Sequence, residues 1–247
     1  MQSILYSLLA GCSTIIGALL LTIFGTPGKK TMSALLGFAG GIMIAISLFE
    51  LLPESKELSN VTTAIVGFLL GCGLMYLLDM FVPHAHLSNS DKLIVENPEN
   101  LKVNSKILRT GYLIFFGIAL HNIPEGLAIG AGIEASPELG LYLAIAIGLH
   151  NIPEGIAVAG PLKAGGLSNI KVLLFTLGAG LMTVVGTAIG LLLFNISPVL
   201  IGGSLAFAAG AMVYIVNDEL IPQANSLNSH LAIAGMIAGL LIGFVFL

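Results

Sequence analysis

Long apolar runs follow one another along almost the whole chain, and this feature limits the folds that the chain can adopt more than any other. They fall at roughly 4–24, 32–53, 61–82, 111–133, 139–161, 172–194, 199–221 and 230–247. A helix of about 20 apolar residues spans the hydrocarbon core of a bilayer. Charged residues make up only 9% of the chain, against about 25% in soluble domains. We therefore predict an all-α polytopic membrane protein, a single transmembrane domain over residues 1–247 with eight transmembrane helices.

The nine basic residues lie almost entirely on one side of such an arrangement. Eight of them fall within 29–30, 92–109 and 163–171, after the first, third and fifth spans, and only Lys56 falls on the other side. Basic residues are enriched in cytoplasmic loops. We therefore expect both termini to be extracytoplasmic, in a multi-pass protein of the cell (inner, cytoplasmic) membrane. The loop at 83–110 contains His84 and His86, either as incidental loop residues or as metal ligands.

Two distant parts of the chain align without gaps when position 38 is placed over position 207, and we call this register the repeat alignment. "FAGGIMIAISLFELLPES" at 38–55 then matches "FAAGAMVYIVNDELIPQA" at 207–224, with Met43, Glu50 and Pro53 over Met212, Glu219 and Pro222. The two copies begin on opposite sides of the membrane, as in the inverted repeats typical of secondary transporters. We predict a 3+2+3 inverted-repeat bundle, with a first repeat at 1–82, a central pair at 111–161 and a second repeat at 170–247.

The central pair carries the motif "LHNIPEG" twice, at 120–126 and at 149–155, near the middle of each span. Glu125 follows His121 by four positions, and Glu154 follows His150 by the same interval. Residues four apart lie on the same face of a helix. Because successive spans run in opposite directions, we expect the two imidazoles and two carboxylates to meet near the bilayer midplane.

Two carboxylates in the hydrocarbon region need a compensating charge. Even a lenient insertion scale assigns about 2.5–3.5 kcal/mol to one charged residue at the centre of a span. A divalent cation offsets both carboxylates while the imidazoles complete its coordination. Histidine with glutamate suits Zn²⁺ best, and Fe²⁺, Mn²⁺, Co²⁺ and Cd²⁺ remain open. Each helix is thus predicted to supply half of one metal site.

Other interpretations of the doubled motif stay open on the residues alone. The polar groups could act as interhelical hydrogen-bonding pairs or as a proton relay. An intramembrane zinc-dependent hydrolase would need an orienting base, and the chain contains no HExxH motif. A passive metal-selective channel would use the same ligands. We expect no enzymatic activity and no nucleic-acid partner.

The doubled HNIPEG in two successive central spans is similar to the signature of the ZIP (Zrt/Irt-like) family of divalent metal transporters, prokaryotic type. The resemblance covers the whole chain, including the matched segments of the second and seventh spans. It implies uptake of metal ions, as substrate rather than cofactor, into the cytoplasm by alternating access. It also implies an elevator-like motion of one helix group against another within a homodimer in the lipid bilayer.

The resemblance also implies roles for particular residues. The metal ligands it implies are His121, Asn122, Glu125, His150, Asn151 and Glu154, with Met43 beside them. Glu50 and Glu57 match positions at the outer entrance, and Asp218 and Glu219 match polar residues near the cytoplasmic exit.

One position departs from the family pattern. Many members have a glutamate in the sixth span that helps to bind a second metal ion, and this chain has Thr183 there. We therefore expect one strong site, with any second position weaker.

Overall fold

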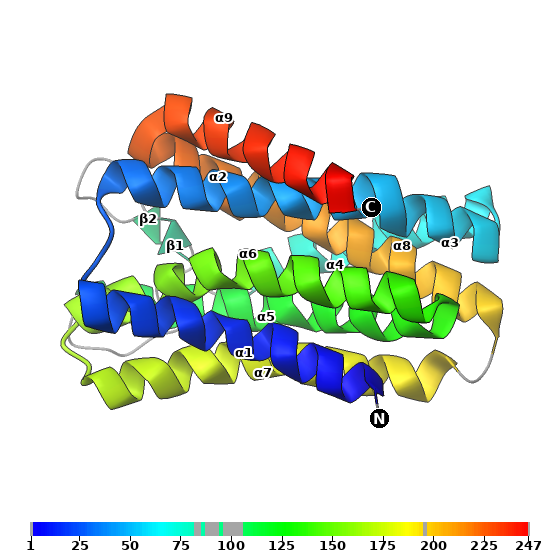
Figure 1. Cartoon of the computed structure of the whole chain (residues 1–247), viewed down its shortest axis with the longest axis horizontal. Helices are drawn as coiled ribbons and strands as arrows, with labels where there is room; N and C mark the ends of the chain where they lie inside the picture. The colour runs from blue at the N-terminus through cyan, green and yellow to red at the C-terminus, as the bar shows by residue number, and fades with distance from the viewer. Residues whose placement is uncertain (1, 82–84, 87–93, 96–105, 195–196, 247) are drawn as a thin grey trace.

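The computed structural model describes residues 2–81, 85–86, 94–95, 106–194 and 197–246 (Figure 1). The helices in the first part are α1 (Gln2–Phe24), α2 (Lys29–Ala45), the π-helical turn η1 (Ile46–Leu51), α3 (Leu52–Leu58) and α4 (Val61–Phe81). Those in the second part are α5 (Lys106–Ala135), α6 (Pro137–Ala164), α7 (Asn169–Phe194), α8 (Pro198–Ile215), the π-helical turn η3 (Val216–Leu220) and α9 (Ile221–Phe246). Between α4 and α5, the two short strands β1 (Ala85–His86) and β2 (Ile94–Val95) pair antiparallel.

Seven helical segments within the described residues are long and apolar enough to cross a membrane. The chain is therefore a multi-pass membrane protein whose spans are helical, as predicted. The last of these segments, Pro198–Val245, contains 48 residues, or about 72 Å of helix, more than twice the thickness of the hydrocarbon core. It is broken at Asn228, where φ is −168° and ψ is 104°. After the break the red part of α9 runs back across the molecule (Figure 1).

A serine from another helix stabilises this break. Ser33 Oγ lies 2.9 Å from the carbonyl oxygen of Ala224 and 2.7 Å from that of Asn228. The Asn228 side chain in turn accepts a hydrogen bond from the backbone N–H of Leu231. The last carbonyl groups of a helix have no partner within it, and Ser33 supplies one for the last turn before the break.

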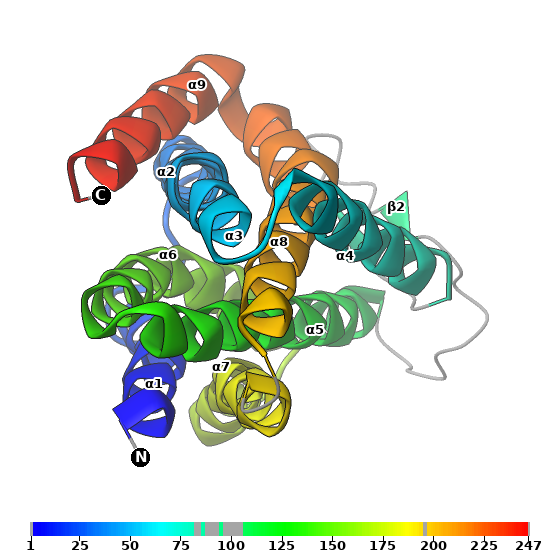
Figure 2. The ribbon, with the colours of Figure 1, turned by 90° about the vertical axis from the view of Figure 1, so that its right-hand side faces the viewer.

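The helices pack as two groups (Figure 2). In the first, which we call the motif group, α1, α5, α6 and α7 contact one another. In the second, which we call the flanking group, α2 packs on α9 and α4 packs on α8. The groups meet where α5 contacts α8 and where α2 contacts α6.

Two glycines set how closely the helices of the motif group approach. A Cβ atom on Gly155 would overlap the carbonyl group of Thr14, and one on Gly126 would overlap the carbonyl group of Thr183. Each glycine ends one copy of the doubled motif, and the repeat alignment places the two threonines over each other. Thus α1 packs on α6 in the same manner as α7 packs on α5.

Candidate metal site

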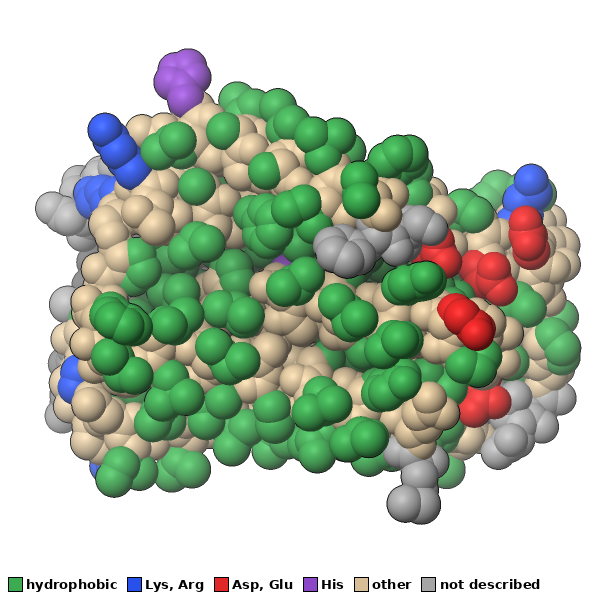
Figure 3. All heavy atoms as spheres, viewed as in Figure 1, with side chains coloured by type: hydrophobic (Ala, Val, Ile, Leu, Met, Phe, Trp, Pro, Cys, Tyr) green, Lys and Arg blue, Asp and Glu red, His purple; other side chains and the backbone are tan. Residues whose placement is uncertain are grey.

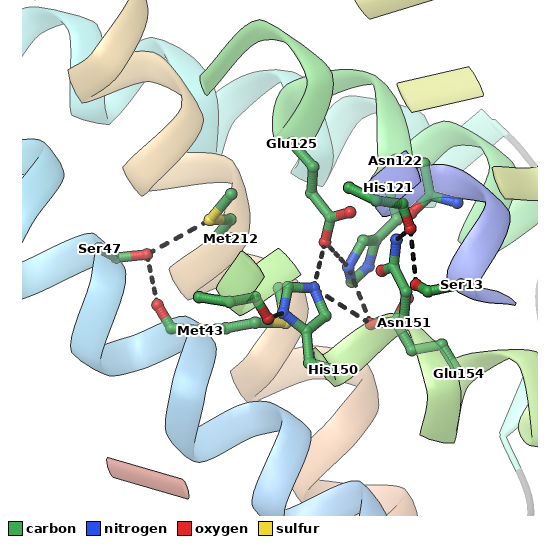
Figure 4. A network of polar contacts seen from close by, with 12 residues as sticks. Ser13, Met43, Ser47, His121, Asn122, Glu125, His150, Asn151, Glu154 and Met212 are labelled. Carbon is green, nitrogen blue, oxygen red and sulfur yellow. Dashed lines mark hydrogen bonds and ion pairs between the residues drawn. The ribbon is translucent and has the colours of Figure 1, made fainter. Parts of the chain in front are cut away.

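Two successive helices of the motif group carry the doubled motif. His121 and Glu125 lie on α5, and His150 and Glu154 lie on α6. The turn between the helices is short, because the hydroxyl of Ser136 accepts a hydrogen bond from Leu139 N–H and starts α6 directly after α5 ends. The four side chains are 0–1% exposed and point toward one another (Figure 4).

The four side chains form one compact cluster. Glu125 Oε1 lies 2.7 Å from His150 Nε2 and 3.1 Å from His121 Nε2. Glu154 Oε1 lies 3.2 Å from His121 Nε2 and 4.0 Å from His150 Nε2. One ligand atom from each residue lies within 4.8 Å of all the others. Tetrahedral zinc with ligand bonds of about 2.0–2.2 Å places its ligands about 3.4 Å apart, so these distances suit one ion after small side-chain adjustments.

Several buried oxygen atoms around the cluster have no hydrogen-bond partner. They are Oε2 of Glu125, Oε2 of Glu154, Oδ1 of Asn122, Oδ1 of Asn151 and Oγ1 of Thr183. Burying such atoms unpaired is costly. A divalent cation would satisfy carboxylate and amide oxygens together, so the donor set fits a metal ion better than it fits an interhelical hydrogen-bond network.

The two asparagines are held by the neighbouring helices. The side-chain amide of Asn122 donates to the carbonyl oxygen of Ala179 on α7 at 2.8 Å, and that of Asn151 donates to the carbonyl oxygen of Ala10 on α1 at 3.1 Å. The repeat alignment places Ala10 over Ala179. These bonds commit each NH₂ group to the backbone and leave each Oδ1 for another partner.

A backbone contact orients one of the imidazoles. His150 Nδ1 lies 3.1 Å from the carbonyl oxygen of Ala146, so it acts as a donor there. A histidine that donates from one nitrogen presents the lone pair of the other to a metal ion. His150 is therefore oriented to bind through Nε2, the atom that faces both carboxylates.

Two methionines of the flanking group lie beside the cluster (Figure 4). Met43 on α2 and Met212 on α8 are fully buried. Ser47 joins them, with Oγ 2.8 Å from the Met43 carbonyl oxygen and 3.6 Å from Met212 Sδ. Met43 was expected beside the site from the family resemblance, whereas Met212 was not, although the repeat alignment pairs the two.

The other acidic residues singled out from the sequence lie outside this cluster. Glu50 is half-buried in η1 and Glu57 is exposed on α3, while Asp218 and Glu219 are half-buried in η3. A Cβ on Gly117 of α5 would lie 3.5 Å from Glu219 Oε1, so that carboxylate lies one turn from His121. On the face shown in Figure 3, acidic side chains gather at one end and most basic ones at the other. His84 lies outside the described residues, and only the backbone of His86 is described.

Comparisons with known proteins identify the family of the chain. The family model described as "ZIP Zinc transporter" matches residues 83–247. The chain is similar to zinc transporter ZupT of Enterobacter sp. (strain 638), with 38% identity over 92% of this chain and 88% of the relative. It is also similar to ZupT of Corynebacterium aurimucosum, with 38% identity over 95% of this chain and 92% of the relative. A third relative is ZupT of Escherichia coli O127:H6, with 36% identity over 92% of this chain and 88% of the relative. Because these matches extend over nearly the whole chain and include both motif helices, the chain belongs to the ZIP zinc transporter family.

Proposed function

We propose that the protein is a carrier that moves Zn²⁺ into the cytoplasm, with the His/Glu cluster as its central binding site. One observation carries this proposal: two imidazoles and two carboxylates, all buried, place a ligand atom each within 4.8 Å of one another. The relatives are named zinc transporters, which favours Zn²⁺ over Fe²⁺, Mn²⁺, Co²⁺ and Cd²⁺. Met43, Asn122 and Asn151 complete the proposed ligand set, with Asn Oδ1 atoms that have no other partner.

The proposed transmembrane arrangement has eight spans, a cytoplasmic loop at 83–110 and both termini outside. The break at Asn228 divides the long segment Pro198–Val245 into a seventh and an eighth span. The 3+2+3 inverted repeat is supported by η1 and η3, since the repeat alignment places Ile46–Leu51 over 215–220, which overlaps Val216–Leu220. We further propose that the active form is a homodimer in the lipid bilayer.

The proposed path runs past acidic residues at both mouths. Metal enters past Glu57 and Glu50, binds the cluster and leaves past Glu219 and Asp218. Glu50 and Glu219 occupy equivalent positions in the two π-helical turns. A carboxylate in each turn gives the ion a weak site on either side of the strong one.

A liposome uptake assay tests the site assignment. Glu154→Gln keeps the size of the side chain but removes its charge, and we expect it to lose most Zn²⁺ uptake. Glu138→Gln, on an exposed position of the same helix, is the matched control and should transport normally. Uptake by Glu154→Gln at the level of the control would refute the assignment.

The same assay distinguishes a carrier from a passive channel and from a metalloenzyme. Flux that saturates at micromolar Zn²⁺ and slows steeply on cooling indicates alternating access, because each transported ion then requires a conformational change. Flux that rises linearly with concentration indicates a passive channel. Lipid or peptide hydrolysis without metal flux would indicate a metalloenzyme.

A further inference from the structure

A long apolar groove opens on the side of the molecule where the motif group meets the flanking group. It has a volume of about 660 Å³. Its walls come from α4 and α8 of the flanking group and from α5 and α7 of the motif group, the four helices seen together in Figure 2. The groove lies outside the metal site, but Leu120 and Pro124, which flank His121 and Glu125 in the chain, form part of its wall.

This groove has few polar side chains, and two of them lie at one of its ends. Among the lining residues, only Thr62, Thr63 and Ser204 have a polar side chain. α4 and α8 run parallel, since Gly67 and Gly71 of α4 approach Gly203 and Phe207 of α8 in turn. Thr62 and Thr63 therefore lie at the end where α4 begins, and Ser204, next to the level of Gly67, lies about a third of the way along the groove. From Thr62 to Leu78 the groove follows α4, a length of about 24 Å at the rise of an α-helix.

We propose that this groove binds one acyl chain of a membrane phospholipid, with its ester group at Thr62 and Thr63. The hydroxyls lie in the first turn of a candidate span, Val61–Leu78, which is the depth of the ester groups in a bilayer. They can donate to ester carbonyl oxygens. Apart from Ser204, the remainder of the groove is apolar, and it is longer than the half-thickness of the hydrocarbon core, about 15 Å.

The bilayer itself is the natural source of this ligand. Water in the groove would face apolar walls, and an unfilled groove would forfeit the dispersion contacts of its lining atoms. A second copy of the chain would present a helix face, which covers a recess without filling it. A flexible acyl chain can fill the recess, and it moves there from the hydrocarbon core of the bilayer, which is equally apolar.

Photolabelling tests the proposal without any metal flux, so its outcome is independent of the proposed transport function. The full chain is reconstituted in phosphatidylcholine vesicles that contain a phosphatidylcholine with a diazirine in its acyl chain. After illumination, labelled peptides are mapped by mass spectrometry. We expect label on the α5 segment Leu120–Leu127, in which Pro124 is buried and the other lining side chains are half-buried, and which acyl chains reach through the groove.

Two substitutions on α4 form a matched pair for this experiment. Leu74 lines the groove and is 41% exposed, whereas Leu77 is 50% exposed and does not line it. Leu74→Trp fills the groove and should reduce labelling of Leu120–Leu127 at least fivefold, while Leu77→Trp should leave it unchanged. Equal labelling in the two variants would overturn the proposal, as would photocrosslinks between two protein chains in place of lipid adducts.

A double variant that changes the shape of the groove less provides a second test in case Leu74→Trp does not fold. Thr62→Val with Thr63→Val keeps the shape of the groove and removes the two hydroxyls. We expect it to lower phospholipid labelling of α5 two- to fivefold and to leave labelling of the exposed face of α4 unchanged. No change on α5 would overturn the assignment of the ester position.

Discussion

At the residue scale, Glu125 joins the two halves of the cluster, since its Oε1 lies 2.7 Å from His150 Nε2 and 3.1 Å from His121 Nε2. The interval of four positions within each motif and the reversal of direction between α5 and α6 place two histidines and two glutamates together, and in the structure one ligand atom from each lies within 4.8 Å of the others. The sequence did not predict which carboxylate contacts which imidazole. Glu125 Oε1 contacts both histidines, whereas Glu154 lies closer to His121 than to His150 on its own helix, because helix rotation and separation decide such differences.

The first residue-scale prediction concerns Glu125. Glu125→Gln replaces the oxygen that contacts both imidazoles and leaves a buried cluster with one charge fewer. Loss of a residue that only supports a metal ligand already weakens binding about 10–100-fold, so for loss of a charged ligand we expect the Kd for Zn²⁺ to rise at least about 100-fold in equilibrium dialysis. Glu134→Gln, exposed on the same helix, should bind like the unchanged protein. A similar Kd in all three proteins would mean that Zn²⁺ binds elsewhere.

The second residue-scale prediction concerns pH. Imidazole and carboxylate must be unprotonated to bind a metal ion, so binding releases protons. We expect the Kd for Zn²⁺ to rise at least tenfold between pH 7.5 and pH 5.5, measured with a competing chelator of known affinity at each pH. A Kd independent of pH would argue against histidine ligands.

At the element scale, the first six predicted spans each coincide with one apolar helical segment, and the last two fall within the single segment Pro198–Val245. Hydropathy placed most span ends close to the observed ones. It did not predict the π-helical turns η1 and η3, because the wider turn of a π-helix leaves no mark on hydropathy. It also did not predict the contacts of the Ser33 hydroxyl with the carbonyl oxygens of Ala224 and Asn228 at the break, because such contacts depend on how distant helices pack.

Gly155 provides a test of helix approach. In Gly155→Ala the new methyl group would overlap the carbonyl group of Thr14, and overpacking of this kind costs about 1–3 kcal/mol. We expect the midpoint of thermal unfolding in detergent to fall by about 2–12 °C. Gly160→Ala, on the same helix with only Leu21 nearby at 3.8 Å, should melt normally. Equal midpoints would show that α1 and α6 separate without cost.

Ser33 provides a test of the break in α9. Ser33→Ala removes the hydroxyl from the carbonyl oxygens of Ala224 and Asn228. Side-chain hydrogen bonds in membrane proteins contribute about 0.6–2 kcal/mol, so we expect a midpoint lower by a few degrees and faster amide exchange in the residues after Asn228. Thr31→Ala, exposed near the start of α2, is the control and should change neither quantity.

At the scale of the whole molecule, charge and repeat patterns predicted more than the helices alone can test. The predicted orientation stays a prediction; the face shown in Figure 3 carries acidic side chains at one end and most of its basic ones at the other. Which helices form the motif and flanking groups was not predictable, since α1 packs on α6 and α2 on α9 across long stretches of chain. Such pairings arise from small residues that many spans share.

Cysteine labelling tests the proposed eight spans. With Cys12 and Cys72 replaced by serine, Lys56→Cys should react with a membrane-impermeant maleimide added to intact cells. Ser229→Cys, exposed next to the break, should react only after the membrane is permeabilised. If the segment Pro198–Val245 crossed only once, Ser229→Cys would lie in lipid and stay unlabelled under both conditions.

The bonds from Asn122 and Asn151 to main-chain carbonyl groups bear on how such a protein tolerates divergence. A carbonyl oxygen is present whatever residue occupies positions 10 and 179, so substitutions there leave the acceptor in place as long as the helix keeps its path. The halves of the chain can therefore drift apart in composition while the distances around the ion stay the same. The geometry around the ion therefore depends on the few residues of the doubled motif and on the path of the backbone.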